Sequence, residues 1–294
     1  MSALTFATAQ LLRVLPRAGM SRAMGRLADR PWPAPINRAI IRLYARVYDV
    51  ALDECAQTDG WESFDAFFTR ALKAGVRPID GDPNVAVSPA DGRVDSFGRI
   101  EEGSTFTVKG RPYRVEELVG SREEAARYAG GAGCVVYLSP RDYHRVHAPV
   151  DGDVRHVRSM PGDYFPVNAI GMRHVPDLFV RNRRVAIAID TTTLGRVTLV
   201  MVAAIVVGRI TVSGVEARDV PIGEITLDPP RKVRKGDEVG MFHLGSTVVV
   251  LIEKAAFGAW VATDGPVQYG QPLSRRATRH ANGTNGGASG GARA

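Results

Sequence analysis

Hydrophobic residues in the larger, C-terminal part of the chain fall in short runs rich in valine and isoleucine, separated by Gly, Asp and Pro. Runs of this kind between turn residues are typical of β-strands. From about residue 85 onward, the expected strands are 105–108, 134–138, 185–189, 197–207, 210–212 and 247–252. Many short strands with few intervening helices predict a mostly antiparallel β domain of the sandwich or barrel-like kind.

The pattern differs at the N-terminus, where apolar and basic positions recur at helical spacing and prolines divide the sequence into two or three short helices. Two further short helices are expected at 63–73 and 121–128. The predicted fold class is therefore α+β, with N-terminal amphipathic helices followed by the β domain. We expect three regions: the helices at 1–56, the β-rich domain at 57–280, and a disordered Gly-rich tail at 281–294 with too few apolar residues to order itself.

Composition excludes several classes of protein. With 294 residues, 45% of them hydrophobic, the chain can form a globular core. Its two cysteines, Cys55 and Cys134, have neither metal-ligand spacing nor the density of a disulfide-rich secreted protein. No run of 18 or more uninterrupted apolar residues occurs, and the N-terminus lacks the arrangement of a signal peptide. These features predict a cytosolic protein or one attached to a membrane face.

The formal charge of +7 is concentrated at the N-terminus, where the first 50 residues contain eight arginines and two aspartates. Within three groups the arginines recur every fourth residue, so each group lines one side of a helix beside apolar residues. The groups are Arg13 and Arg17; Arg22, Arg26 and Arg30; and Arg38, Arg42 and Arg46. Such helices suit the interface of an anionic membrane, but also a solvated face of helices packed on the protein's own core. Nucleic acid is disfavoured because no aromatic stacking platform accompanies the arginines.

One segment near the middle of the chain concentrates candidate chemistry. Ser139 and Pro140 are typical of the first positions of a helix, which predicts a short helix over 140–147. His144 and His147, three apart, would then project from one face of that helix. A histidine pair suits proton transfer or metal binding, or has only a structural hydrogen-bonding role. Metal is disfavoured because no nearby carboxylate or cysteine set completes a tetrahedral site.

A second candidate lies where Gly245 and Ser246 precede the apolar run 247–252. A glycine at the start of a strand is typical of a β-bulge or a close backbone approach, in which case Ser246 is an ordinary hydroxyl at the end of a strand. This fragment alone does not distinguish that interpretation from chemistry at the Gly-Ser bond.

Four segments together resemble the phosphatidylserine decarboxylase family of the bacterial and mitochondrial type. They are 88–92, 137–147, 168–182 and 244–247, in the family's order, and the resemblance runs from about residue 60 to residue 275. It implies a pyruvoyl-dependent carboxy-lyase that converts phosphatidylserine to phosphatidylethanolamine and CO2. It also implies a proenzyme that cleaves itself between Gly245 and Ser246.

In the chemistry that this resemblance implies, the hydroxyl of Ser246 attacks the carbonyl of Gly245, and the ester then eliminates. The chain 246–294 would begin with a pyruvoyl group in place of the serine. This covalent cofactor forms a Schiff base with the lipid amine and accepts the electrons released as CO2 leaves. Glycine before the serine lets the attacked carbonyl adopt backbone angles closed to other residues.

The resemblance also implies roles for individual side chains. His147 is expected to be the base that activates Ser246, with Asp91 as the carboxylate that orients its imidazole. His144 is expected to supply the proton after decarboxylation or to position the substrate carboxylate. His243 is discounted as the base, because on a continuous extended strand its side chain would point away from Ser246.

The implied partners are phosphatidylserine, an anionic membrane surface and the two cleaved chains, 1–245 and 246–294; a homo-oligomer stays open. The expected location is peripheral, at the cytoplasmic face of the cell membrane. Two alternatives remain: a decarboxylase of a related serine-headgroup lipid, and a non-catalytic membrane-binding member of the family. Loss of Ser246, His147 or Asp91 would indicate the second alternative, and all three are present.

Overall fold

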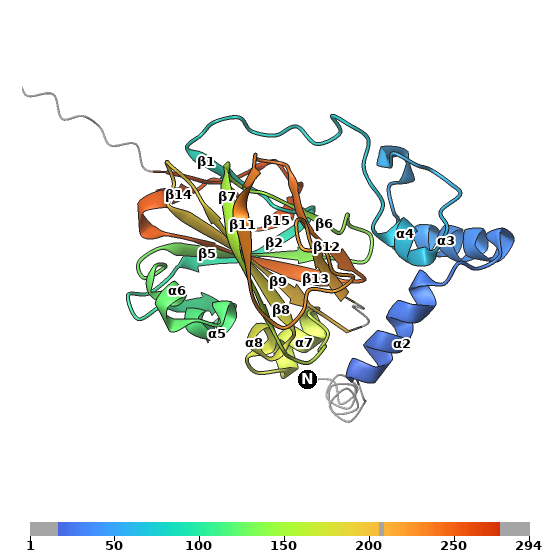
Figure 1. The fold of residues 1–294 in the computed structure, drawn as a ribbon, viewed down its shortest axis with the longest axis horizontal. Helices are drawn as coiled ribbons and strands as arrows, with labels where there is room; N and C mark the ends of the chain where they lie inside the picture. Colours follow the sequence, from blue (N-terminus) through green and yellow to red (C-terminus); the bar gives the residue numbers. More distant parts are fainter. Residues whose placement is uncertain (1–16, 206–208, 277–294) are drawn as a thin grey trace, which may run out of the picture.

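The structure is a computed structural model that describes residues 17–205 and 209–276. Its centre is an eight-stranded antiparallel sheet in the order β11-β7-β8-β9-β13-β5-β2-β15 (Figure 1). In that order the strands are Gly223–Val233, Gly152–Met160, Arg184–Asp190, Arg196–Ala203, Ser246–Ile252, Ala132–Leu138, Gly92–Arg99 and Gly265–Val267. β13 therefore lies between β9 and β5, and every residue of it is buried.

Two smaller sheets and a hairpin complete the described β-structure. One sheet has the order β10-β12-β6, the other β1-β16-β14, and β3 pairs with β4. Their bounds are Arg209–Val212 (β10), Glu238–His243 (β12), Arg145–His147 (β6), Val85–Val87 (β1), Pro272–Arg275 (β16), Ala259–Trp260 (β14), Thr105–Val108 (β3) and Arg111–Arg114 (β4). Because β12 belongs to a small sheet and β13 to the large one, the residues between them, Leu244 and Gly245, form the turn by which the chain changes sheets. We call it the sheet-changing turn.

The helices form two groups (Figure 1). α2 (Arg17–Asp29), α3 (Ala34–Tyr48) and α4 (Phe64–Phe68) gather on one side of the sheets, with a 3-10 turn at Leu52–Glu54. Along the lower side of the molecule in this view lie α5 (Val115–Val119), α6 (Arg122–Ala126), α7 (Ala169–His174) and α8 (Leu178–Arg181); a second 3-10 turn is Lys254–Ala256. Phe68 of α4 packs with Ala28 of α2 and with Leu244, so α4 connects the N-terminal helices to the sheet-changing turn.

The α+β class is confirmed, and the described residues form no closed barrel. The predicted strands correspond to β3, β5, β8, β9, β10 and β13, although β9 already ends at Ala203. The helix predicted at 121–128 is α6, whose N-cap Ser121 accepts a hydrogen bond from the N–H of Glu124 (3.1 Å). The helix predicted at 63–73 ends early, at Phe68.

The helix predicted over 140–147 is wrong. Asp142 N–H donates to the Ser139 carbonyl (3.0 Å), and the N–H and hydroxyl of Ser139 both donate to Asp142 Oδ2 (2.7 Å each). Ser139 and Asp142 therefore close a single turn, which does not continue as a helix. The chain then becomes extended as β6, because pairing with β12 outweighs a helical preference that is only local. His144 and His147 do not share a helix face.

Some predictions fall on residues that the structure does not describe. The first N-terminal helical segment, with Arg13, lies within 1–16, and the Gly-rich tail lies within 277–294, so both are outside the described residues. Within the described ranges, the helices are too short or too polar for any of them to cross a bilayer.

Candidate active site

The sheet-changing turn has unusual backbone geometry. Leu244 has a φ angle of 81° and Gly245 one of 55°, so two consecutive residues occupy the left-handed region. Glycine tolerates that region, whereas an ordinary L-residue is strained there by roughly 1–2 kcal/mol. Gly245 thus has backbone angles that favour glycine, as expected. The strain at Leu244 leaves no signal in the sequence.

Ser246 is the first residue of β13 and is 1% exposed. It pairs with Leu138 of β5 and with Ala203 of β9, so neighbouring strands hold its backbone on both sides. Its hydroxyl oxygen has no hydrogen-bond partner among the described residues. Buried hydroxyls are usually hydrogen-bonded, and an exception calls for an explanation such as a chemical role.

His243, the last residue of β12, faces a buried cluster of ion pairs. Its Nδ1 lies 2.9 Å from each carboxylate oxygen of Asp65 in α4, and its Nε2 lies 3.3 Å from Thr211 Oγ1 in β10. The prediction that discounted His243 assumed an extended strand running on to Ser246. That premise is wrong, because the turn at 244–245 interrupts the strand.

His144 lies beside the same turn. It is fully buried, its ring centroid is 4.2 Å from that of Phe68, and its carbonyl accepts a hydrogen bond from Phe242 N–H. Its Nδ1 donates to the Asp142 carbonyl (2.8 Å), and its Nε2 has no partner among the described residues. Burial lowers the pKa of His144 from 6.5 to about 3; the Asp142 hydrogen bond opposes this shift and the charge of Arg70 adds to it. His144 is therefore a neutral imidazole with a free lone pair on Nε2.

His147 lies at the other end of β12, where it pairs with Glu238. Its Nδ1 donates to the Gly236 carbonyl (2.7 Å), and its Nε2 is 3.2 Å from the hydroxyl of Tyr143. The ring stacks on that of Tyr269, with centroids 3.9 Å apart and an interplanar angle of 6°. Burial lowers the pKa of His147, although the hydrogen bond to Gly236 and nearby negative charges oppose the shift. Both ring nitrogens thus have partners.

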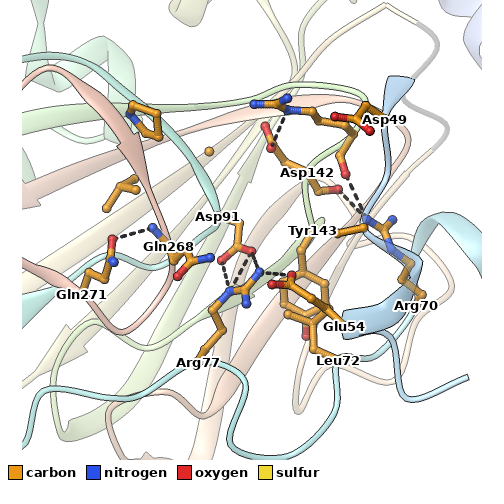
Figure 2. Close-up of a pocket in the computed structure, with 15 residues that line it drawn as sticks. Asp49, Glu54, Arg70, Leu72, Arg77, Asp91, Asp142, Tyr143, Gln268 and Gln271 are labelled. Carbon is orange, nitrogen blue, oxygen red and sulfur yellow. Dashed lines mark hydrogen bonds and ion pairs between the residues drawn. The ribbon is translucent and has the colours of Figure 1, made fainter. Parts of the chain in front are cut away.

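Asp91 binds Arg77 (Figure 2). In the described part of the chain no hydrogen bond joins Asp91 to His147. Arg77 Nε and Nη2 donate to Asp91 Oδ2 (3.0 and 2.7 Å), and Nη2 also donates to Glu54 Oε2 (2.6 Å). Burial disfavours the charged guanidinium, but these bonds outweigh it and raise the pKa of Arg77. Tyr269 connects Asp91 to His147 indirectly, because its N–H donates to Asp91 Oδ1 (2.9 Å) while its ring stacks on the imidazole.

A polar cavity of about 440 Å³ opens beside Asp91 (Figure 2). Residues with charged or hydrogen-bonding side chains dominate its wall: Asp49, Glu54, Arg70, Arg77, Asp91, Arg141, Asp142, Tyr143, Gln268 and Gln271. Arg70 donates through Nη2 to the carbonyls of Arg141 (3.0 Å) and Asp142 (3.3 Å), which fixes the loop 139–144. We call this space the polar cavity.

A second concavity, of about 580 Å³, lies between the N-terminal helices and the sheet-changing turn. Its wall is almost entirely apolar and includes Met24, Leu27, Ala28, Trp32, Ile40, Tyr44, Phe64, Phe68, Leu244 and Gly245. We call it the apolar groove. The loop 139–144 contributes Pro140 to the groove and its next three residues to the polar cavity. Tyr44 of α3 holds that loop from the groove side, since its hydroxyl donates to the Pro140 carbonyl (2.9 Å).

The predicted residues therefore fall into two sets. His144 and Gly245 lie with Ser246 near the end of β12 that precedes the turn, whereas His147 and Asp91 lie around Tyr269 near the polar cavity. Sequence reasoning missed the residues that hold both sets, namely Asp65, Phe68, Arg70, Arg77 and Tyr269. The available signal was a pair of charged residues, Asp65 and Arg70, within an aromatic-rich segment.

Comparisons with known proteins agree on one family. The family model for phosphatidylserine decarboxylase matches residues 64–275, a range that contains every candidate residue. Three curated relatives carry the name phosphatidylserine decarboxylase proenzyme. Those of Anaeromyxobacter sp. (strain K), Psychrobacter arcticus and Myxococcus xanthus are 39%, 40% and 38% identical to this chain. The alignments cover 89%, 90% and 83% of this chain and 95%, 96% and 88% of the relatives, respectively.

Proposed function

Because this chain belongs to the phosphatidylserine decarboxylase family, we propose that it is a self-processing, pyruvoyl-dependent enzyme that converts phosphatidylserine to phosphatidylethanolamine and CO2. The observation that carries the proposal is the geometry at Gly245–Ser246. A buried hydroxyl that has no hydrogen-bond partner within residues 17–205 and 209–276 directly follows two residues in left-handed backbone. These residues fit the chemistry that would generate a pyruvoyl group from Ser246.

In the proposed cleavage, Ser246 Oγ attacks the carbonyl carbon of Gly245 and gives its proton to a base. The peptide C–N bond breaks, and the nitrogen of residue 246 takes a proton, which leaves an ester. Removal of the α-proton of residue 246 then expels the carboxylate of Gly245 and leaves a dehydroalanine at position 246. Water hydrolyses this group, which releases ammonia and leaves the pyruvoyl group. Strain released when the Leu244–Gly245 turn opens favours the first step.

We assign the base role to His147, with Asp91 as its supporting carboxylate, by resemblance to the family. The geometry supports a shared environment, since Tyr269 contacts both groups. In the intact chain His147 Nε2 contacts the hydroxyl of Tyr143, so a change in the 139–144 loop, which contains Tyr143, must free that nitrogen before it can accept the proton of Ser246 Oγ. His144, whose Nε2 is free beside the turn, is assigned to proton handling in decarboxylation.

A pyruvoyl carbonyl at position 246 would supply the electron sink for loss of CO2. The protein's own residues supply the surroundings. The polar cavity offers charged side chains for the phosphate, amine and carboxylate of a serine headgroup, and the apolar groove, whose wall includes Gly245, suits acyl chains. A decarboxylase of another serine-headgroup lipid would use the same two spaces, so a panel of lipids with that headgroup and different backbones separates the two substrates.

The N-terminal helices support attachment to a membrane surface. α3 buries Ile41 and Ala45 against α4, yet a second stripe of apolar side chains on the same helix is exposed. The exposed residues are Ile36, Ile40, Leu43 and Val47 on α3, with Met20, Met24 and Leu27 on α2. Arginines beside an apolar stripe are typical of helices that lie in an anionic interface. We propose a peripheral location at the cytoplasmic face of the membrane.

Intact-mass analysis of the purified protein tests the cleavage. We expect two chains, residues 1–245 and 246–294, the shorter with an N-terminus blocked to sequencing. The matched variant Ser246→Ala should remain a single chain. Ser246→Cys should accumulate a thioester that hydroxylamine cleaves at the same bond. An uncut 31.7 kDa parent after long incubation at neutral pH would refute self-processing.

A further inference from the structure

We infer that His243 and Asp65 are positioning residues for self-processing, which hold the sheet-changing turn in its strained form and tie it through Arg209 to helix α2. This inference rests on the proposed self-cleavage and adds residues to it. From the sequence alone, Asp65 had no expected role and His243 was discounted as the base.

The contacts form a continuous chain from the turn to the N-terminal helices. His243 Nδ1 donates to Asp65, at 2.9 Å from each oxygen. Arg209 Nη2 donates to Asp65 Oδ2 (2.8 Å), and its Nη1 donates to both oxygens of Asp29 (2.7 and 2.6 Å). Asp29 is the last residue of α2, and the exposed Arg218 also pairs with it.

The charges and hydrogen-bonding roles in this cluster are complementary. Two carboxylates, Asp29 and Asp65, face two guanidinium groups, Arg209 and Arg218, so the formal charges of these four side chains balance. An imidazole that donates from Nδ1 to Asp65 can accept from the Thr211 hydroxyl at Nε2. The side chains of His243 and Asp65 are only 9% and 11% exposed, so water competes little with this bond.

The turn itself needs such support. A leucine in left-handed backbone persists only where its surroundings over-determine it. Here three anchors act within four residues: His243 is held by Asp65, Leu244 packs among Ala28 and Phe68, and Ser246 is fixed in the large sheet. α4 supplies both Asp65 and Phe68, so one short helix holds the turn from two sides. This arrangement keeps the Gly245 carbonyl next to Ser246 in a single geometry.

Loss of these contacts should affect self-cleavage more than CO2 release, whereas a general loss of stability would lower both activities together. Cleavage severs the chain directly after the turn, so its strained form matters before the cut and not after it. The loss in cleavage rate should therefore exceed any loss in CO2 release per pyruvoyl group by about tenfold or more. A residue that serves only the fold would lower both rates alike.

The experiment follows cleavage of full-length precursor made by cell-free translation, by intact mass over time, in three variants. His243→Phe keeps the ring shape and removes the donor, and should slow cleavage by about tenfold or more, as expected when a bond to a charged group is lost. His243→Asn restores a donor to Asp65 and should recover part of the rate. Lys232→Gln, at an exposed ion pair with Asp153 outside this cluster, is the control and should cleave within about twofold of the parent.

Cleavage of His243→Phe at the parental rate would overturn the inference, as would equal losses in cleavage and in CO2 release per pyruvoyl group. If His243→Phe does not fold, Asp65→Asn and Arg209→Lys decide the question by the same ratio of rates. Failure of the proposed function is a different result, because then the parent itself would not cleave.

Discussion

The polar cavity and the apolar groove share one loop but offer opposite chemistry. The polar cavity has charged walls, with the Arg77–Asp91–Glu54 cluster in Figure 2, whereas the groove is lined by aromatic and aliphatic side chains of α2, α3 and α4. The turn with the expected cleavage bond opens to the groove, while the expected base and its carboxylate lie on the polar side.

A polar and an apolar space on either side of one loop would suit the two parts of an amphipathic substrate. An amphipathic molecule needs an apolar space for its chains and a polar space for its headgroup, and the loop 139–144 contributes to both. Tyr44 holds the loop from the groove and Arg70 holds it with a buried guanidinium. A change in this loop would therefore alter the walls of both spaces.

Separate replacement of His144 and His147 should give the largest effects, and it tests whether cleavage and decarboxylation depend on different residues. His147→Ala should block cleavage, because loss of a general base costs about 10²- to 10⁴-fold in rate. His144→Ala should still cleave at least in part, yet release little CO2. Time courses of intact mass and of CO2 from headgroup-labelled phosphatidylserine measure the two steps. If both variants behave like the parent, the segment 140–147 is not part of the active site; the reverse outcome would make His144 the base.

Much of the fold around these two spaces can be predicted from the sequence, but the features that depend on contacts between distant residues cannot. The strands around β13 were predictable because valine-rich runs bounded by turn residues have few other structures available. The local capping residues Ser139 and Asp142 also predicted a turn, yet whether it continued as a helix depended on β12, almost a hundred residues away. For the same reason the partners of His243 could not be predicted from its position on a strand.

Removing the central cation of the polar cavity should have the next largest effect. Arg77→Met leaves the carboxylates of Asp91 and Glu54 without their partner, and breaking a buried pair in this way costs about 3–5 kcal/mol. Urea unfolding in a Ser246→Ala background, where the chain stays intact, measures the free energy of unfolding. Arg275→Gln, which removes an exposed pair with Asp82, should leave the free energy of unfolding nearly unchanged.

Adding Asp91→Asn to Arg77→Met should restore part of the lost stability, since it removes one of the carboxylates left unpaired. If Arg77→Met alone is as stable as the parent, Arg77 does not organise the polar cavity.

Replacing residues of the exposed apolar stripe of α3 should have a smaller effect, seen in membrane binding. Leu43→Asp with Val47→Asp should weaken co-sedimentation with vesicles about tenfold or more, because each apolar side chain buried in the interface contributes roughly 1.5–3 kcal/mol. Ile222→Asp, at an exposed apolar residue far from α2 and α3 in sequence, is the control. Equal losses in both proteins would mean that the N-terminal helices do not meet the lipid.

The arginines beside the stripe should contribute less. Arg38 and Arg42 already pair with Asp59, so replacing them and Arg46 with glutamine should lower affinity mainly for anionic vesicles. That loss should disappear at 1 M salt, where the Debye length falls to about 3 Å. A loss of equal size on neutral vesicles would show that these side chains act by packing and not by charge.

The smallest effect concerns His144, which lies between the two spaces and should make stability depend on pH. The unfolded chain binds a proton at this side chain below pH 6.5, whereas the folded protein, with a pKa of about 3, does not. The stabilising contribution is therefore present above pH 6.5 and is lost as the pH falls from 6.5 toward 3, with a slope of about 1.4 kcal/mol per pH unit. In the Ser246→Ala background, His144→Gln should remove this slope. Between pH 6.5 and 5.0 the free energy of unfolding, measured with urea, should fall by about 2 kcal/mol less in the variant than in the parent. Above pH 7 the difference between the two proteins should be constant. Parallel curves down to pH 5.0 would mean that water reaches His144 and that the groove and the polar cavity are one wet space.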